Sequence, residues 1–213
     1  FQSAGKGRLG RKWMAPEGSS VMMSILLKPE FEPQYASMLT LVMGLSVAQA
    51  VCELGVEVSI KWPNDIVVHG KKVCGILTEM STQMDYINYI VIGIGINVQN
   101  EAFPEEIGEV ATSLRIESGK KQNRAAIIEA VWEEFEKYYD IYLKTEDMQG
   151  LVGEYNRKLA NMNQQVRVLD PKDPYEGTAR GITPKGELIV DTWEARKLVS
   201  SGEVSVRGLY GYV

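Results

Sequence analysis

The 213-residue sequence has little metal-ligating chemistry, since it contains one histidine, His69, and two cysteines, Cys52 and Cys74. No Cys-x-x-Cys pair occurs, which excludes a zinc cluster of the usual spacing. Both cysteines lie in apolar surroundings, which suits small buried thiols in a reducing compartment. We therefore expect a cytoplasmic protein. His69 precedes Gly70 in a predicted turn, and we interpret it as a solvated turn residue rather than a catalytic base.

The sequence also lacks an excess of basic residues. Lys and Arg number 23 against 28 Asp and Glu, which gives a formal net charge of −5. A general nucleic-acid binder would carry a basic face, so this balance argues against one. No uninterrupted apolar run reaches the roughly 18 residues of a transmembrane helix, and no signal peptide is visible. We expect neither a membrane nor a nucleic acid as a partner.

Glycine and cations are concentrated near the start of the chain, in Gly5-Lys-Gly-Arg-Leu-Gly-Arg11. Such a segment cannot build a core, but its backbone N–H groups and guanidinium groups can approach a phosphate or a carboxylate. The G-x-G-x-x-G pattern that it contains would bind a dinucleotide only if a helix opened on it, whereas Pro16, Gly18 and a predicted strand follow. We interpret the segment as an anion-binding loop, with a solvated basic loop as the alternative.

Hydrophobic periodicity predicts a mixed or antiparallel sheet packed with helices over the first three quarters of the chain. Apolar or alternating runs predict strands at 21–27, 56–60, 66–68, 71–80 and 89–98, and His69-Gly70 supplies a tight turn between the third and the fourth. The last of these strands is apolar on both faces, which indicates a central place in the sheet. Apolar residues at three- and four-residue spacing predict helices over 33–55, 123–142 and 149–159, and we expect a short helical piece within 103–119.

The composition changes near Asn161, where a run of polar residues precedes a set of short strands. Five strands joined by turns are predicted between 166 and 207, and this spacing indicates a small β-barrel. The sequence therefore predicts an α+β fold with a domain boundary near Asn161.

Lys61-Trp-Pro-Asn-Asp65 forms a corner between two predicted strands. Pro63 blocks regular pairing there and directs the neighbouring side chains. Asp65 accepts hydrogen bonds only, so it could hold a divalent metal or orient a lysine.

The following strands add a cation and a flat surface. Lys72 and Gly75 lie on one predicted strand, and Gly75 permits close approach of a ligand. Gly93 and Gly95 lie on one face of the next strand and leave an apolar floor there. Asn97 follows them and could bond a phosphate or a ribose. A basic loop, a carboxylate, a lysine and an amide around an apolar slot suit an apolar carboxylic acid that is activated by a nucleotide.

Four blocks of the sequence resemble those of the biotin–protein ligases, or biotin–[acetyl-CoA-carboxylase] ligases, in order and spacing: Gly5–Trp13, Lys61–Asp65, Lys72–Glu79 and Gly93–Asn97. The tail Ser201–Arg207 resembles the C-terminal SH3-like barrel of that family. The resemblance implies a fold like that of class II aminoacyl-tRNA synthetases, with a catalytic domain over 1–161 and an SH3-like domain over 162–213. It implies an enzyme that uses ATP and Mg²⁺ to convert biotin to biotinoyl-5′-AMP. The biotin then passes to a lysine of a biotin carboxyl carrier protein, and a homodimer is allowed for.

The resemblance also implies roles for individual residues. Biotin would be bound by Gln2, Lys6, Gly7, Arg8, Lys72, Gly75 and Gly93. ATP would be bound by Arg8, Arg11, Trp13, Asn64, Lys72, Asn97 and Arg207, with Glu203 beside the nucleotide. The catalytic residues would be Lys72, Arg8 and Asp65, and Asp65 would also hold Mg²⁺.

The sequence departs from the family pattern in two places. Lys6 stands where the family usually has arginine, which keeps the charge but loses the bidentate fork. The Ser-Thr-Asn segment that precedes the loop in the family is absent, and the chain opens on Phe1-Gln2 without an initiator Met. We interpret this as truncation, with which any N-terminal DNA-binding domain would also be lost.

Two other functions are compatible with much of this pattern. A lipoate–protein ligase would share the fold and the two-step chemistry, but the Lys61–Asp65 block followed by the Gly93–Asn97 block favours biotin. A non-catalytic sensor or repressor that binds the biotin adenylate is disfavoured, because sensing alone does not require Asp65, Lys72 and Arg8. A peptide- or RNA-binding role for the C-terminal barrel is disfavoured by the acidic composition.

Overall fold

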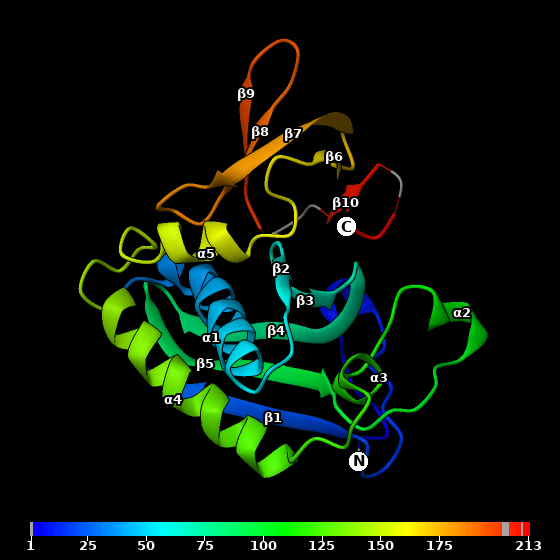
Figure 1. The fold of residues 1–213 in the computed structure, drawn as a ribbon. Coiled ribbons are helices and arrows are strands. Elements are labelled where there is room, and N and C mark those ends of the chain that lie inside the picture. The colour runs from blue at the N-terminus through cyan, green and yellow to red at the C-terminus, as the bar shows by residue number, and fades with distance from the viewer. Residues whose placement is uncertain (1, 202–204, 210) are drawn as a thin grey trace.

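The computed structural model describes residues 2–201, 205–209 and 211–213. Two five-stranded sheets, each antiparallel between neighbouring strands, are joined through helix α5 (Val152–Lys158), as Figure 1 shows. The buried residues of both sheets belong to one continuous hydrophobic cluster. This arrangement agrees with the predicted α+β class.

The first sheet contains all the strands predicted before Asn161. Their order across the sheet is β1 (Ser20–Leu27), β5 (Tyr86–Asn97), β4 (Lys71–Gln83), β3 (Asp65–Val68) and β2 (Ser59–Lys61). The strand predicted at 56–60 starts later than expected, and β4 runs three residues further because β4 and β5 continue as a long hairpin. The His69-Gly70 turn is confirmed, and both residues have positive φ angles.

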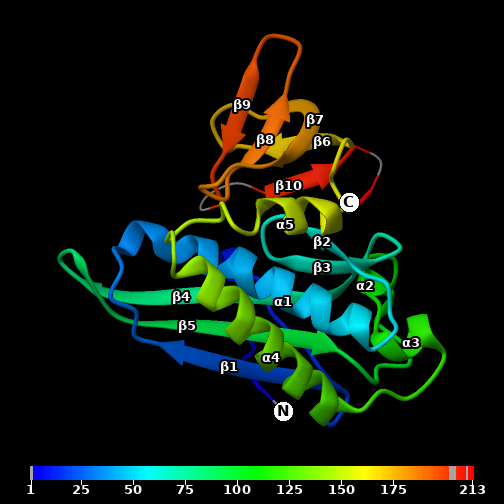
Figure 2. The same ribbon diagram turned by 60° about the vertical axis from the view of Figure 1, so that its left-hand side comes forward.

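Two helices, α1 (Leu39–Glu53) and α4 (Arg124–Tyr142), cover one face of the first sheet, as the views in Figures 1 and 2 agree. The Asn123 side chain accepts hydrogen bonds from the first backbone N–H groups of α4, which caps that helix. Gly55 follows α1 with a φ of 86°, the left-handed conformation that commonly terminates a helix.

Helix α1 corrects one expectation from the sequence. Together with the preceding 3₁₀ turn, the segment Pro33–Glu53 is long and apolar enough to cross a membrane, although no such segment was expected. Most of this segment is buried in the protein, and α1 is apolar nearly all round because it packs against the sheet, α4 and α5. Burial in the core accounts for its composition.

The face of the first sheet opposite α1 and α4 is where the glycines lie. In β5, Ile90, Ile92, Ile94 and Ile96 are buried toward the helices, and the alternate positions face the other way. The strand pairs with β1 on one side and β4 on the other, so its predicted interior position is confirmed. Gly95 of β5 pairs with Gly75 of β4, and these two positions leave a shallow floor.

The second sheet contains the five strands predicted after Asn161. Their order is β10 (Ser205–Gly208), β6 (Gln165–Leu169), β7 (Tyr175–Ile182), β8 (Leu188–Asp191) and β9 (Arg196–Val199). The first two residues of the strand predicted at 203–207 lie outside the described residues. The SH3-like assignment and the boundary between 161 and 162 stay predictions. Two short helices, α2 (Glu105–Gly108) and α3 (Leu114–Ser118), lie in the connection after β5.

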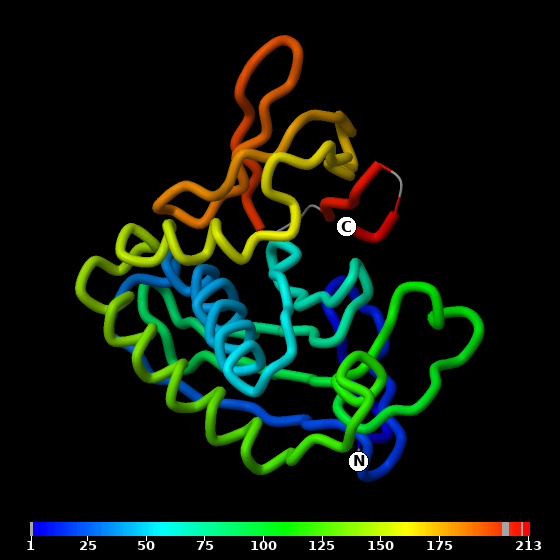
Figure 3. Tube along the Cα trace, in the orientation of Figure 1, coloured from blue at the N-terminus to red at the C-terminus, as the bar shows by residue number. Residues whose placement is uncertain are grey.

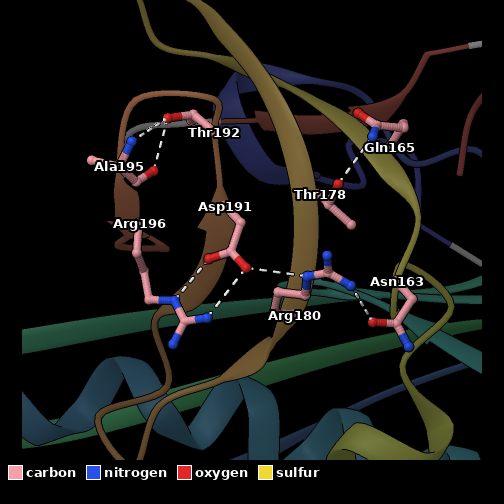
Figure 4. A network of polar contacts seen from close by, with 8 residues as sticks. All are labelled: Asn163, Gln165, Thr178, Arg180, Asp191, Thr192, Ala195 and Arg196. Atoms are coloured by element: carbon pink, nitrogen blue, oxygen red, sulfur yellow. Dashed lines mark hydrogen bonds and ion pairs between the residues drawn. The ribbon is translucent and has the colours of Figure 1, made fainter.

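An exposed polar network crosses the second sheet, as Figure 4 shows. Asp191 accepts from Arg196 at 2.7 Å and from Arg180 at 3.2 Å, and Arg180 also donates to Asn163 at 2.9 Å. Exposed pairs of this kind contribute little to stability, so we assign the network no role beyond joining β7, β8 and β9.

The two sheets meet at the corner between β2 and β3. The Trp62 indole is buried and donates to the Gly186 carbonyl at 3.1 Å, and the Met148 amide donates to the Pro184 carbonyl at 2.7 Å. In Figure 2 the second sheet lies beside α5 and the β2–β3 corner. The Lys61–Asp65 block is therefore held where residues from both sheets can contribute to one site.

Candidate functional site

The loop from Gly5 to Trp13 closes over the open face of the first sheet as a short hairpin. The Gly7 amide donates to the Arg11 carbonyl at 2.7 Å, and the Trp13 amide donates to the Gly5 carbonyl at 3.0 Å. A single 3₁₀ turn at Arg8–Gly10 forms the tip. The basic side chains are thereby carried to the sheet on a loop that has its own backbone hydrogen bonds.

A cavity of about 240 Å³ lies between this loop and the sheet, and we call it the glycine-floored cavity. Its floor is Gly75, Gly93 and Gly95, and its walls include residues of β1. Among the predicted biotin-binding residues, all seven line it: Gln2, Lys6, Gly7, Arg8, Lys72, Gly75 and Gly93. Its volume is slightly below the range usual for small-molecule sites, roughly 300–1,000 Å³.

The Trp13 ring rests on the floor of this cavity. A Cβ on Gly95 would lie 2.6 Å from the ring, so the ring can approach there only because the residue is glycine. A Cβ on Gly75 would lie 3.2 Å from the ring, a tight contact. A Cβ on Gly93 would meet its nearest neighbour, the Leu77 carbonyl oxygen, at an ordinary 3.6 Å. The indole N–H is buried without a hydrogen-bond partner, a donor that a ligand with an acceptor group could satisfy.

A second cavity of about 110 Å³ adjoins the first, and we call it the cationic cavity. Six cationic side chains line it: Arg8, Arg11, Lys12, Lys61, Lys72 and Arg207. Among the residues that the structure describes, Asp65 is the only acidic side chain in its lining. The two cavities share Gly7, Arg8, Trp13, Asn64 and Lys72, so they meet at the predicted catalytic cations.

The predicted catalytic pair Asp65 and Lys72 is in contact. The Lys72 Nζ lies 2.5 Å from the Asp65 Oδ1, and Asp65 is only 6% exposed. Asp65 pairs with Gly75 across β3 and β4, and the Lys72 side chain lies over Gly75 to reach it. Gly75 thus admits the lysine side chain as well as the Trp13 ring.

Mg²⁺ does not fit Asp65 as the structure has it. Each carboxylate oxygen already has a close partner, because the Tyr212 hydroxyl donates to Oδ2 and the Lys72 ammonium forms an ion pair with Oδ1, although Oδ1 accepts no hydrogen bond. Within the described part of the chain, no group of three or more His, Cys, Asp or Glu side chains is placed to hold a metal ion. A cation would also have to enter a cavity that is already strongly positive.

Lys61 is a site residue that the sequence analysis left without a role. It is 7% exposed, and its Nζ lies 4.1 Å from the centre of the Tyr212 ring. Burial lowers the pKa of Lys61 to about 8; Asp65 opposes this shift, and Lys72, Arg207 and Arg11 add to it. A buried lysine among like charges would have indicated an anion site, but the sequence shows neither its burial nor its neighbours.

Arg8 connects the Gly5–Trp13 loop to the chain that follows β9 of the second sheet. Its guanidinium donates a hydrogen bond to the Ser201 carbonyl. Burial lowers the pKa of Arg8 from its ordinary value, and the Asp65 carboxylate opposes the shift. Arg8 therefore stays cationic and contributes to both cavities.

The remaining predicted nucleotide residues fall into two groups. Arg11, Trp13, Asn64 and Arg207 line the cationic cavity, and the Asn64 amide is held by the Ile76 carbonyl at 3.1 Å. Asn97 lines neither cavity, since it is buried and donates to the Thr112 carbonyl at 3.1 Å. The structure therefore does not bring Asn97 to the other candidates, and Glu203 lies outside the described residues. The binding roles themselves stay predictions.

The sequence matches two protein-family profiles and several proteins of known function. The profile of the "Biotin/lipoate A/B protein ligase family" matches residues 1–97, and that of the "Biotin protein ligase C terminal domain" matches residues 162–207. A biotin–[acetyl-CoA-carboxylase] ligase of Mycobacterium tuberculosis is 32% identical over 209 residues, which cover 95% of this chain and 75% of the relative. The "Bifunctional ligase/repressor BirA" of Bacillus subtilis is 36% identical over 208 residues, or 96% of this chain. The chain spans 64% of that relative's length.

A solved structure has a similar fold over nearly the whole chain. The biotin protein ligase from Aquifex aeolicus, in complex with biotin and ATP, superposes with a TM-score of 0.87 at 35% sequence identity. The superposition covers 97% of this chain and 86% of the Aquifex chain.

Proposed function

Because the chain belongs to the biotin protein ligase family, we propose that it is an ATP-dependent, AMP-forming biotin–[acetyl-CoA-carboxylase] ligase. It would convert biotin to biotinoyl-5′-AMP and transfer the biotinoyl group to a lysine of a biotin carboxyl carrier protein. The observation that carries the proposal is the junction of the two cavities. The glycine-floored cavity, lined by both apolar and polar side chains, meets a cationic one at Lys72 and Arg8, where an acid and a phosphate would have to meet.

The first step joins two anions. A biotin carboxylate oxygen would form a bond to the α-phosphorus of ATP, and the bond from that phosphorus to the bridging oxygen would break, so that pyrophosphate leaves with the electron pair. Lys72 and Arg8 line both cavities and would screen the repulsion between carboxylate and phosphate. Lys61, Arg11 and Arg207 would neutralise the departing polyphosphate.

We assign no step to Mg²⁺ at Asp65. Its two oxygens are held by Lys72 and Tyr212, so the carboxylate is placed to orient the lysine rather than to ligate an ion. Any Mg²⁺ that the reaction uses would enter on the nucleotide phosphates, as is usual for this ion.

The second step needs mainly positioning. The neutral amine of the acceptor lysine would attack the carbonyl carbon of the mixed anhydride, an amide bond would form, and AMP would leave with the electrons of the broken C–O bond. The attacking nitrogen would release one proton to water. A carrier protein as acceptor, a homodimer, a cytoplasmic location and the lack of a nucleic-acid partner all belong to this proposal. The two cysteines are free thiols, which is compatible with such a location.

Lys72→Ala tests the proposal at its centre. We expect formation of biotinoyl-adenylate to fall by about 10²–10³, the usual effect of losing one preorganised charge donor. Adenylate formation would be measured as biotin-dependent release of pyrophosphate. The matched control is Lys71→Ala, the adjacent lysine, which lines neither cavity and donates instead to the Gly108 carbonyl. A Lys72→Ala protein that is folded and as active as the control would contradict the assigned role.

A further inference from the structure

The chain beyond β10 returns from the second sheet to the first. Gly208, at the end of β10, lies against the Val213 carbonyl. Tyr212 reaches the cationic cavity from the chain beyond β10, although Tyr212 and Asp65 are separated by 147 residues in sequence. In Figure 3 the C-terminus lies near β10, on the side of the second sheet that faces the first.

Tyr212 contacts two groups of opposite charge. Its hydroxyl donates to the Oδ2 of Asp65, whose Oδ1 is held by Lys72 at 2.5 Å. Its ring faces the Nζ of Lys61 at 4.1 Å, within the range of a cation–π interaction. The buried carboxylate therefore accepts a hydrogen bond at Oδ2 and forms an ion pair at Oδ1, and the buried lysine is held against an aromatic face.

The hydroxyl is a permanent donor at this position. Burial raises the pKa of Tyr212 from its ordinary value, and the Asp65 carboxylate raises it further, so the phenol stays protonated throughout the neutral range. A carboxylate that is only 6% exposed has few other donors available to it. Without the phenol hydroxyl, the Asp65 carboxylate would be free to rotate, and its ion pair with Lys72 would weaken.

We propose that Tyr212 is a positioning residue of the adenylation site, acting through Asp65 on Lys72 and directly on Lys61. The inference rests on the proposed function, and it makes Tyr212 a part of the polyphosphate-binding cavity. Tyr212 itself need not touch the reacting atoms. Its effect is to keep two lysines in place before the nucleotide arrives, which lowers the cost of organising them during the reaction.

A double-mutant cycle on ATP binding tests this coupling. Four proteins are titrated calorimetrically with MgATP, with and without biotin: wild type, Tyr212→Phe, Asp65→Asn and the double variant. We expect Tyr212→Phe to weaken ATP binding about tenfold in the wild-type background and less than twofold in the Asp65→Asn background, because neighbours in one network are not additive. The phenylalanine keeps the ring, so only the hydroxyl is removed.

Tyr86→Phe is the matched control, because Tyr86 is 59% exposed on the β4–β5 hairpin and lines neither cavity. Circular dichroism of each protein establishes that it is folded. Equal losses in both backgrounds, no loss in either, or a wild-type protein that does not bind ATP would overturn the inference. A wild-type protein that binds ATP but makes no biotinoyl-adenylate would instead overturn the proposed function, and the cycle would still report on Tyr212.

Discussion

Lys61 shows how one residue can oppose stability and still fit a binding site. Its pKa in the folded protein is about 8 against an ordinary 10.5, mainly because of burial. Below pH 8 the folded and the unfolded chain both carry the proton, and the full cost of burying the charge applies. Between pH 8 and 10.5 the folded protein releases the proton first, so the free energy of unfolding rises with pH. The difference of 2.5 units corresponds to roughly 3 kcal/mol.

Lys61→Met should therefore stabilise the ligand-free protein at neutral pH by up to about 3 kcal/mol, an advantage that shrinks as the pH rises from 8 toward 10.5. The measurement is the free energy of unfolding in urea at several pH values for both proteins, so that other titrating groups cancel. Lys120→Met, at an exposed lysine, is the control and should show no such trend. A difference between Lys61→Met and wild type that stays constant with pH would contradict the account. The same substitution should weaken ATP binding.

Among the secondary-structure elements, the packing of the Trp13 ring on strand β5 depends on a single glycine, Gly95. Gly93 and Gly95 occupy the same face of β5, yet only Gly95 lies directly beneath the Trp13 ring. The strand is paired on both sides, whereas Trp13 is carried by a loop whose backbone hydrogen bonds, from Gly7, Arg11 and Trp13, are made within the loop itself. An added methyl group at Gly95 should therefore displace the ring rather than the strand.

Gly95→Ala is expected to expose Trp13 and shift its fluorescence emission to longer wavelength in the ligand-free protein, whereas Gly93→Ala should leave the emission unchanged. The contribution of Trp13 is identified by repeating the measurement with Trp13→Phe, since the chain contains four tryptophans. Identical spectra for the two alanine variants would show that the ring does not rest on Gly95.

Sequence patterns predicted most elements because their causes are local. The apolar run 89–98 predicted β5, the His69-Gly70 turn predicted the β3–β4 hairpin, and Asn123 marked the start of α4. The all-round burial of α1 could not be predicted, since it depends on α4 and α5, which follow it in the chain.

The candidate site was predicted in part for the same reason. Lys72, Arg8 and Asp65 stand in recognisable blocks, and the structure brings them together. The importance of Lys61 and Tyr212 depends on burial and on a contact across 147 residues, which no local pattern reports. Asn97 belongs to a recognisable block as well, but its amide is used by the Thr112 carbonyl.

At the scale of the whole molecule, the candidate site is shared between the two sheets. The first sheet supplies the glycine floor, Asp65 and the lysines, while Arg207 and Tyr212 come from the second sheet and the segment after it. The Arg8 hydrogen bond to the Ser201 carbonyl also joins the two parts. We propose that this shared site activates a specific acid with ATP, which requires both sheets of the chain.

The most direct measurement is exchange of labelled pyrophosphate into ATP by the purified chain, with biotin, with lipoate and with neither acid. Exchange requires reversible formation of an acyl-adenylate, so it reports the first step without an acceptor protein. We expect exchange with biotin and none above background with lipoate or without acid. Exchange with lipoate in place of biotin, or no exchange by the folded protein with any acid, would contradict it.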